Sequence, residues 1–228
     1  LIEAEEGRFD QAEAILIQAI GALQQTGNTE MLIETRIRLA GIYFMMQRWD
    51  SAAEQYETVL EMEDLPKPTR RLARMGLSNV WTQSGEVAKG EAILEEIYKE
   101  DPNDPGVNND LGYLYADQGK NLEQAERMIR IAVAAEGDNP SYLDSLGWVL
   151  FKLGRLDEAL EFQKKAVAIP NHDDSTLLEH QGDIHEALKQ LDEARKLWQQ
   201  ALDLEQKDKR PDNKVIERLE GKLKPASR

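Results

Sequence analysis

The chain repeats one pattern along most of its length. Residues 146–166, LGWVLFKLGRLDEALEFQKKA, echo residues 111–132, LGYLYADQGKNLEQAERMIRIA, which begin 35 residues earlier. Successive units are 38, 34, 35 and 35 residues apart, a period typical of stacked-repeat architectures. Aligned on this echo, mostly small residues recur in three series: Ala40, Ser78, Gly112, Gly147 and Gly182; Ala52, Gly90, Ala125, Ala159 and Ala194; Val59, Ile97, Ala132, Ala166 and Ala201.

Each unit has the pattern of two helices joined by a tight turn. Apolar residues have helical spacing in the first half of a unit, as at Leu143, Leu146 and Leu150. Gly154 suits a left-handed helix end, and Asp157 suits the positive end of the next helix dipole. Small residues are expected where the two helices cross, because only a small side chain lets the backbones approach closely. New units begin with a capping residue followed by proline: Asp104-Pro105 and Asn139-Pro140.

These residues resemble the tetratricopeptide repeat family. The match covers the small positions, the large residue three after the first of them (Tyr43, Trp81, Tyr115, Leu150) and Pro near unit ends (Pro102, Pro140). The resemblance implies an all-α fold, a right-handed α-solenoid of stacked antiparallel helix pairs with a C-terminal capping helix. Three positions depart from the family pattern. Gly90 replaces the usual Ala and is expected to weaken its helix, His185 replaces a large aromatic, and Lys189 replaces the turn Gly.

We expect repeats at residues 33–66, 71–104, 105–139, 140–174 and 175–206. Residues 1–32 match the second helix of a truncated repeat, and residues 207–228 form a basic tail with a capping helix. The stretch around Pro66 and Pro68 is either a local loop insertion or a bend between two blocks of units. The chain opens without Met in a mid-helix pattern, so we expect it to be a segment of a longer protein.

The charge pattern bears on the class of partner. The net charge is −15, and residues 207–228 carry eight Lys or Arg against four Asp or Glu, so the tail is +4 and the rest −19. A chain this acidic is expected to bind no nucleic acid. No apolar run is long enough to suggest membrane insertion. The absence of Cys rules out disulfides but leaves the localisation unknown, with cytoplasm and periplasm both open.

No motif for catalysis or for a cofactor stands out. The sequence lacks GxxxxGK[ST], GxGxxG and GxSxG, and HEALK at His185 lacks the second His of a zinc pair. His172, His180 and His185 have no metal-ligand spacing. We therefore expect no enzyme activity, no cofactor and no metal site.

The family resemblance implies that the first helices line a concave groove. The expected partner-binding positions on this face are Phe44, Asn79, Asn109, Tyr113, Asp117, Asp144, Trp148, Phe151, Glu179, Asp183 and Glu186. Tyr113 and Trp148 occupy the same position in adjacent units, and are either aromatic anchors for a partner or packing between helices. Glu179, Asp183 and Glu186 form an acidic stripe that is either a binding surface or a solvated face.

The leading hypothesis is a non-catalytic module that binds a protein or peptide partner of apolar and basic character in the groove. The groove lacks a basic set of Lys and Arg, so we expect it not to bind acidic C-terminal tails. One alternative is a recruiting or regulatory arm of a larger enzyme or of an envelope or secretion assembly. Another is a homo-oligomeric scaffold. The basic tail could reach the acidic groove of its own copy, or of another copy to form the oligomer.

Overall fold

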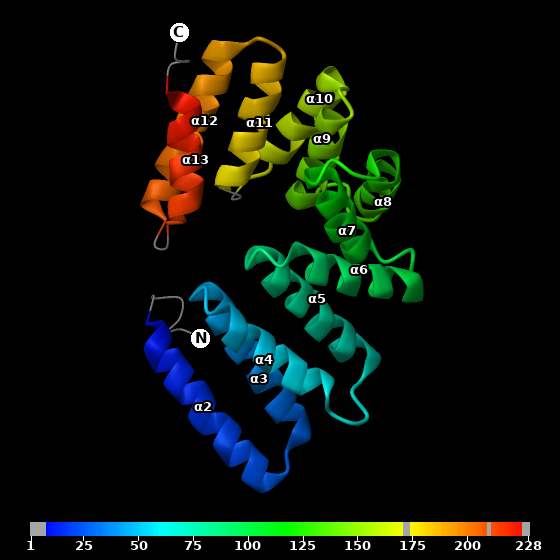
Figure 1. Ribbon diagram of the computed structural model, residues 1–228, viewed down its shortest axis with the longest axis vertical. Helices are drawn as coiled ribbons and strands as arrows, with labels where there is room; N and C mark the ends of the chain where they lie inside the picture. Colours follow the sequence, from blue (N-terminus) through cyan, green and yellow to red (C-terminus); the bar gives the residue numbers. More distant parts are fainter. Residues whose placement is uncertain (1–7, 171–173, 209–210, 225–228) are drawn as a thin grey trace. The chain divides into compact units, whose positions relative to one another are not determined.

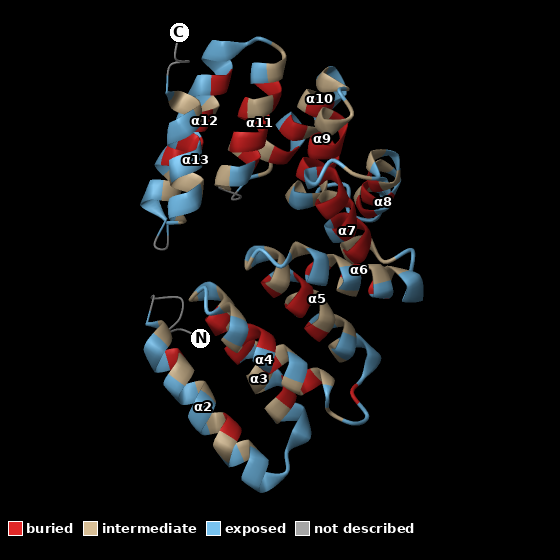
Figure 2. Cartoon of the chain, in the orientation of Figure 1, coloured by how far each residue is buried: buried red, intermediate tan, exposed pale blue. Residues whose placement is uncertain are grey.

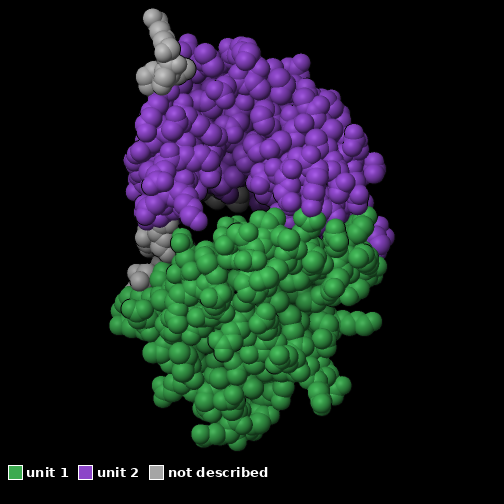
Figure 3. Space-filling model, in the orientation of Figure 1, with its two compact units in different colours: residues 1–101 green, residues 102–228 purple. Residues whose placement is uncertain are grey.

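The computed structural model describes residues 8–170, 174–208 and 211–224 of the chain, which form twelve α-helices and no strand. His172 and parts of the two terminal segments lie outside these residues. The chain divides into two compact units, Leu1–Asp101 and Pro102–Arg228 (Figure 3). This division follows Asp101, whereas Pro66, which precedes the helix Lys67–Gln83, and Pro68, in the first turn of that helix, both lie inside unit 1.

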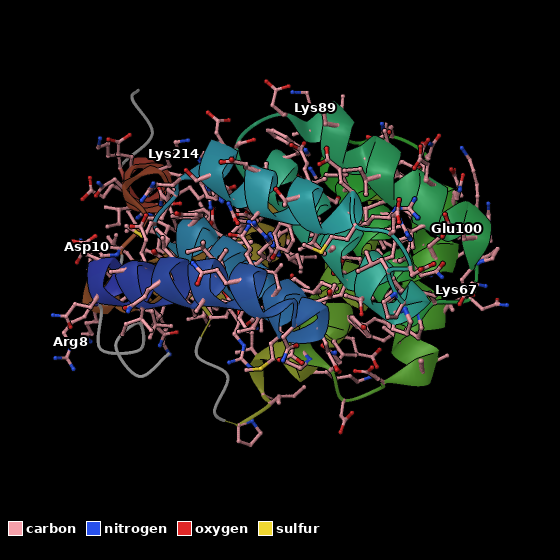
Figure 4. All side chains as sticks on the ribbon, turned by 90° about the horizontal axis from the view of Figure 1, so that it is seen from below. Arg8, Asp10, Lys67, Lys89, Glu100 and Lys214 are labelled. Carbon is pink, nitrogen blue, oxygen red and sulfur yellow. The ribbon has the colours of Figure 1, made fainter. Side chains whose placement is uncertain are left out.

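Unit 1 is a run of antiparallel helices in which each packs against the next (Figure 1). Lys67 begins α5 and Glu100 ends α6, and the two lie at the same end of that pair (Figure 4). The helices of unit 1 are α2 (Phe9–Thr26), α3 (Thr29–Met45), α4 (Trp49–Leu60), α5 (Lys67–Gln83) and α6 (Val87–Glu100).

Unit 2 holds three complete helix pairs and one further helix (Figure 1). The first helices of the pairs are α7 (Pro105–Asp117), α9 (Pro140–Lys152) and α11 (Ser175–Ala187); their partners are α8 (Leu122–Ala135), α10 (Leu156–Val167) and α12 (Leu191–Lys207). The additional helix, α13 (Asn213–Leu223), packs against α12 as the expected capping helix. Its Leu219 is fully buried against Trp198 and Leu202.

The helix ends follow from local chemistry. Asp104 accepts a hydrogen bond from the Val107 backbone N–H at 3.0 Å and so caps α7. Gly154 ends its helix with φ 77°, the left-handed conformation that glycine adopts without steric cost. Lys189 adopts φ 64° at the matching turn of the last pair, so that turn keeps its geometry without a glycine.

The small residues lie where paired helices cross and are almost fully buried. A Cβ added to Gly147 would lie 3.3 Å from the carbonyl oxygen of Ala159, on the partner helix α10. A Cβ on Gly90 would lie 2.7 Å from the carbonyl oxygen of Ser78, which is closer than real Cβ atoms approach. Gly90 therefore does more than weaken α6, because it permits a contact between α5 and α6 that is too close for alanine.

Candidate functional site

The first helices of unit 2 lie next to one another, α7 against α9 and α9 against α11. Buried residues concentrate along these three helices, whereas α13 is mostly exposed (Figure 2). Nine of the eleven expected site residues lie on these three helices, and the other two belong to unit 1. We call this surface the first-helix face of unit 2.

A buried polar cluster lies at the centre of this face. The His180 Nδ1 atom on α11 lies 3.0 Å from both carboxylate oxygens of Asp144 on α9. Gln163 Nε2, on α10, donates to Asp144 Oδ1 at 2.5 Å and to the carbonyl oxygen of Leu177 at 2.9 Å. Asp144 thus ties three helices together, because its carboxylate accepts from two of them.

The cluster controls the charge of the histidine. Burial lowers the pKa of His180, but the charge of Asp144 and its hydrogen bond outweigh burial, so the pKa lies above its usual value. The ring of His180 is almost fully buried and lies under Trp148 at 4.0 Å between ring centroids. A histidine enclosed in this way favours a structural role over general acid–base catalysis.

Aromatic rings extend from this histidine along the face. Trp148 stacks on His180 and on Phe151, with the second pair of centroids 5.0 Å apart. Tyr113 on α7 approaches His180 with a centroid distance of 6.3 Å. Lys152 Nζ lies 4.7 Å above the Trp148 ring, where a cation is attracted to the π-face. We call Tyr113, Trp148, Phe151 and His180 the aromatic row.

Two buried polar atoms beside the aromatic row have no hydrogen-bond partner. They are Oδ1 of Asn109 and Nε1 of Trp148, and each of these two residues is 8% exposed as a whole. The Asn109 amide nitrogen is used, because it donates to Asp110 Oδ1 at 3.1 Å. A buried acceptor or donor without a partner costs about 1–3 kcal/mol, so both atoms favour any group that can complete them.

The acidic stripe is covered by α13 rather than solvated along its length. Glu179 is 3% exposed and accepts two hydrogen bonds from Arg218, from Nε and Nη2, each at 2.7 Å. Lys222 Nζ lies 2.5 Å from Asp183 Oδ1 and 2.8 Å from Glu179 Oε1. Asp183 also accepts from the Trp198 indole at 2.9 Å. The basic tail therefore reaches the acidic stripe of its own chain.

These cations decide the protonation of Glu179. Burial alone would raise the pKa of Glu179, but its hydrogen bonds to Arg218 and Lys222 and their charges hold it below the usual value. The carboxylate therefore stays charged and paired inside the interface between α11 and α13.

The remaining expected residues stand apart from this network. Glu186 and Asp117 are exposed on α11 and α7. Phe44 and Asn79 belong to unit 1, where Phe44 packs edge-on against Trp49 at 5.3 Å and Asn79 is exposed. The structure thus places Asp117 and Glu186 as exposed residues on the helices of this face, and only Phe44 and Asn79 in the other unit.

Four residues of the network were not expected from the sequence: His180, Gln163, Arg218 and Lys222. One signal for the cations was available, because Arg218 and Lys222 are four apart, as are Glu179 and Asp183. Such matched spacing on two helices favours paired charges. His180 and Gln163 gave no comparable signal, since both meet Asp144 only through packing of separate helices.

The described parts of the chain contain no group of three or more His, Cys, Asp or Glu side chains able to hold a metal ion. In the same parts, none of the helices has the length and apolar character needed to cross a membrane.

Known proteins share this architecture. Family models described as tetratricopeptide repeat match residues 1–62, and residues 38–105 and 109–175. No curated protein matches the chain. Among solved structures, the fold is similar to a thermophilic TPR protein of Thermus thermophilus, with TM-score 0.67, 21% identity, and coverage of 84% of this chain and 98% of that one.

Two further solved structures share the fold at lower identity. BtubC from P. vanneervenii gives TM-score 0.66 at 16% identity, with 96% of this chain and 95% of that chain covered. The APC/C hetero-tetramer Cut9–Hcn1 gives TM-score 0.71 at 17% identity, with 92% of this chain and 40% of that chain covered. At these identities the likeness concerns the fold alone.

Proposed function

Since the chain belongs to the tetratricopeptide repeat family, we propose that it binds a partner peptide along the first-helix face of unit 2, over the aromatic row. Proteins of this family generally act as non-catalytic scaffolds for protein–protein interaction. The observation that carries the proposal is the pairing of stacked aromatic side chains with two buried, unpartnered polar atoms on one face.

The polar atoms match the chemistry of a peptide backbone. Asn109 Oδ1 accepts and Trp148 Nε1 donates, so a backbone N–H and a backbone C=O would complete them. Both atoms are enclosed, and the half-buried rings of Tyr113 and Phe151 beside them are the groups that would turn aside to admit a chain. Aromatic rings at such a position supply most of the contact area in many interfaces.

The charge around the aromatic row selects the side chains of the partner. Asp117 and Glu186 are exposed acids at the edges of the face, and the chain as a whole is strongly acidic. Lys152 is the cation placed over the row, and its Nζ already contacts the Trp148 ring. A partner with apolar anchors and basic flanking residues is therefore favoured, and an acidic peptide is disfavoured.

A second candidate is an arm that recruits partners within a larger assembly. In the APC/C hetero-tetramer Cut9–Hcn1 a similar fold forms part of an assembly, and this chain covers 40% of the matched chain. Both candidates use the same face, so the test of the face below applies to each. They differ in stoichiometry, which mass measurement of the complex with its partner would distinguish.

The face is tested by selecting peptides from a random display library on the immobilised full chain, followed by titration of the best peptide. We expect a consensus of apolar and basic residues and at least a tenfold loss of affinity in Tyr113→Ala and Phe151→Ala. Tyr98→Ala and Phe162→Ala remove half-buried rings from second helices and are the matched controls.

Asn109→Leu separates binding from stability. Leucine removes the unpartnered acceptor, so the free energy of unfolding should stay the same or rise, while peptide affinity should fall. Affinity unchanged in Tyr113→Ala, Phe151→Ala and Asn109→Leu together would place binding elsewhere and refute the proposed site.

A further inference from the structure

We propose that the acidic side of α11 is the docking site for a basic amphipathic helix of the partner, and that α13 fills this site in cis until the partner replaces it. The proposal rests on the proposed function and names the partner more closely. Its occupant is a helix with two cations four residues apart on one edge and apolar residues beside them.

The docking site, which we call the seat, consists of Glu179 and Asp183 on α11 with the apolar side chains beside them, and it has a defined charge pattern. Glu179 and Asp183 lie one helical turn apart on α11, and Arg218 and Lys222 lie one turn apart on α13. Arg218 donates two hydrogen bonds of 2.7 Å to Glu179, and Lys222 forms ion pairs with both Glu179 and Asp183. A bidentate Arg–carboxylate pair adds geometric selectivity as well as energy.

The seat also has an apolar floor. Trp198 and Leu202 on α12, with Leu178 on α11, receive the apolar edge of α13. Of the α13 residues only Leu219 is buried, while its other apolar side chains, Val215, Ile216 and Leu223, are half-buried. An isolated helix of eleven residues is marginal in water, so α13 depends on this seat for its order.

A helix that replaces α13 must supply cations. When α13 leaves, Glu179 becomes open to water, but a neutral or acidic helix in its place would bury the carboxylate again without Arg218 and Lys222, and an unpaired buried carboxylate is strongly destabilising. A neutral or acidic helix therefore cannot replace α13. A basic helix can, because it restores the pairing, and this requirement defines the chemistry of the partner.

The seat borders the aromatic row. Arg218 on α13 pairs with Glu179 at 2.7 Å, and the next residue on α11, His180, stacks on Trp148 at 4.0 Å between ring centroids. Glu179 of the docking site is therefore adjacent on α11 to His180, a member of the aromatic row. A peptide that enters along Tyr113 and continues as a helix over α11 therefore meets α13.

The partner helix and α13 compete for the same site. Tethering gives α13 an effective concentration in the millimolar range, so a ligand in trans binds with affinity reduced by the fraction of seats that are open. Weakening α13 in cis, without changing the seat, should raise the affinity for a ligand in trans by the same factor. This relation makes the proposal measurable before the natural partner is known.

The test uses a fluorescent peptide with the sequence of residues 211–224, titrated against the full chain by anisotropy. The double substitution Arg218→Glu with Lys222→Glu in the chain places two acids of α13 against Glu179 and Asp183, so α13 is repelled from the seat. We expect at least tenfold tighter peptide binding than in wild type. Arg218→Gln with Lys222→Gln is the milder variant should charge reversal prevent folding. Lys214→Glu with Lys224→Glu makes the same change in net charge on exposed side chains and should bind as wild type.

The seat itself is tested by adding Glu179→Gln with Asp183→Asn to the charge-reversed chain, which should abolish the gain. Equal peptide affinity in wild type and in both weakened chains would overturn the proposal, as would a gain that survives the change of seat. Failure here leaves the display-selected peptide and the Tyr113, Phe151 and Asn109 variants as an independent test of the proposed function. A gain here with no effect of those three variants would reject the aromatic row and keep the seat.

Discussion

The substitution Gly90→Ala tests whether close helix crossing outweighs helix propensity. Alanine is more favourable than glycine inside a helix by about 1 kcal/mol, so local preference alone predicts stabilisation. The structure predicts the opposite. The added Cβ would press on Thr82 Oγ1, which can rotate, and would lie 2.7 Å from the Ser78 carbonyl oxygen, which belongs to the α5 backbone and cannot.

The magnitude follows from these two opposing effects. Forcing an extra methyl group into a close-packed contact costs about 1–3 kcal/mol, and the gain in propensity offsets about 1 kcal/mol of this. The expected net loss is about 1 kcal/mol in the free energy of unfolding. For a chain of this size, that loss corresponds to a fall in Tm of about 2–4 °C.

Gly41→Ala is the matched control in the same unit. Gly41 lies within α3, and an added Cβ there would meet no atom within 4 Å. Alanine should therefore stabilise the chain at Gly41 by about 0.5–1 kcal/mol and destabilise it at Gly90. Urea denaturation followed by circular dichroism measures both. Equal stabilisation by the two substitutions would refute the argument from close crossing.

Three further predictions concern single contacts. The raised pKa of His180 means that its protonated form stabilises the fold fully below about pH 6.5, and that this contribution is lost as pH rises through the raised pKa. The Tm of the wild-type chain should therefore fall as pH rises from about 6.5 through the raised pKa of His180. In His180→Gln or Asp144→Asn, thermal melts over the same pH range should show a smaller change in Tm. Lys189→Gly should raise the free energy of unfolding by about 1 kcal/mol, because Lys189 holds φ 64°; a decrease in the urea midpoint would contradict this. Arg48→Ala should cost about 1 kcal/mol at low salt and less at high salt, since Arg48 pairs with Glu13 at 2.8 Å on a partly exposed surface; a cost that does not change with salt would argue against the pair.

The repeated features of the fold were predictable because they depend on short-range sequence. The caps at Asp104 and Asn139 follow from residues within one turn of each other, and the helix pairs and the small residues at their crossings follow from the repeat of about 35 residues. The capping helix was also predictable, since Val215, Ile216, Leu219 and Leu223 repeat at helical spacing.

The expectation for Gly90 shows the limit of such reasoning. Glycine there was expected only to weaken the helix, because propensity concerns the helix by itself. The close approach of the Ser78 carbonyl depends on the distance between two helices, and this distance cannot be obtained from either helix alone.

The candidate site was predictable as a set of positions but not as a network. Helical register placed Tyr113, Trp148 and Phe151 on first helices, yet only packing stacks Trp148 on His180 and buries Asn109. The predicted acidic stripe likewise exists along α11. Whether it meets water or cations depends on where the tail folds back.

The sequence by itself determined the all-α repeat architecture, the pairing of helices and the opposite charges of the stripe and the tail, because periodicity and charge are properties of the chain order. Tertiary structure decided which charges are buried. Glu179 pairs with Arg218, and Asp144 pairs with Gln163. The partners of each pair lie on separate helices, so the pairs form only when those helices pack. Burial then removes water as the competing partner, so these few contacts hold the charged groups in one arrangement.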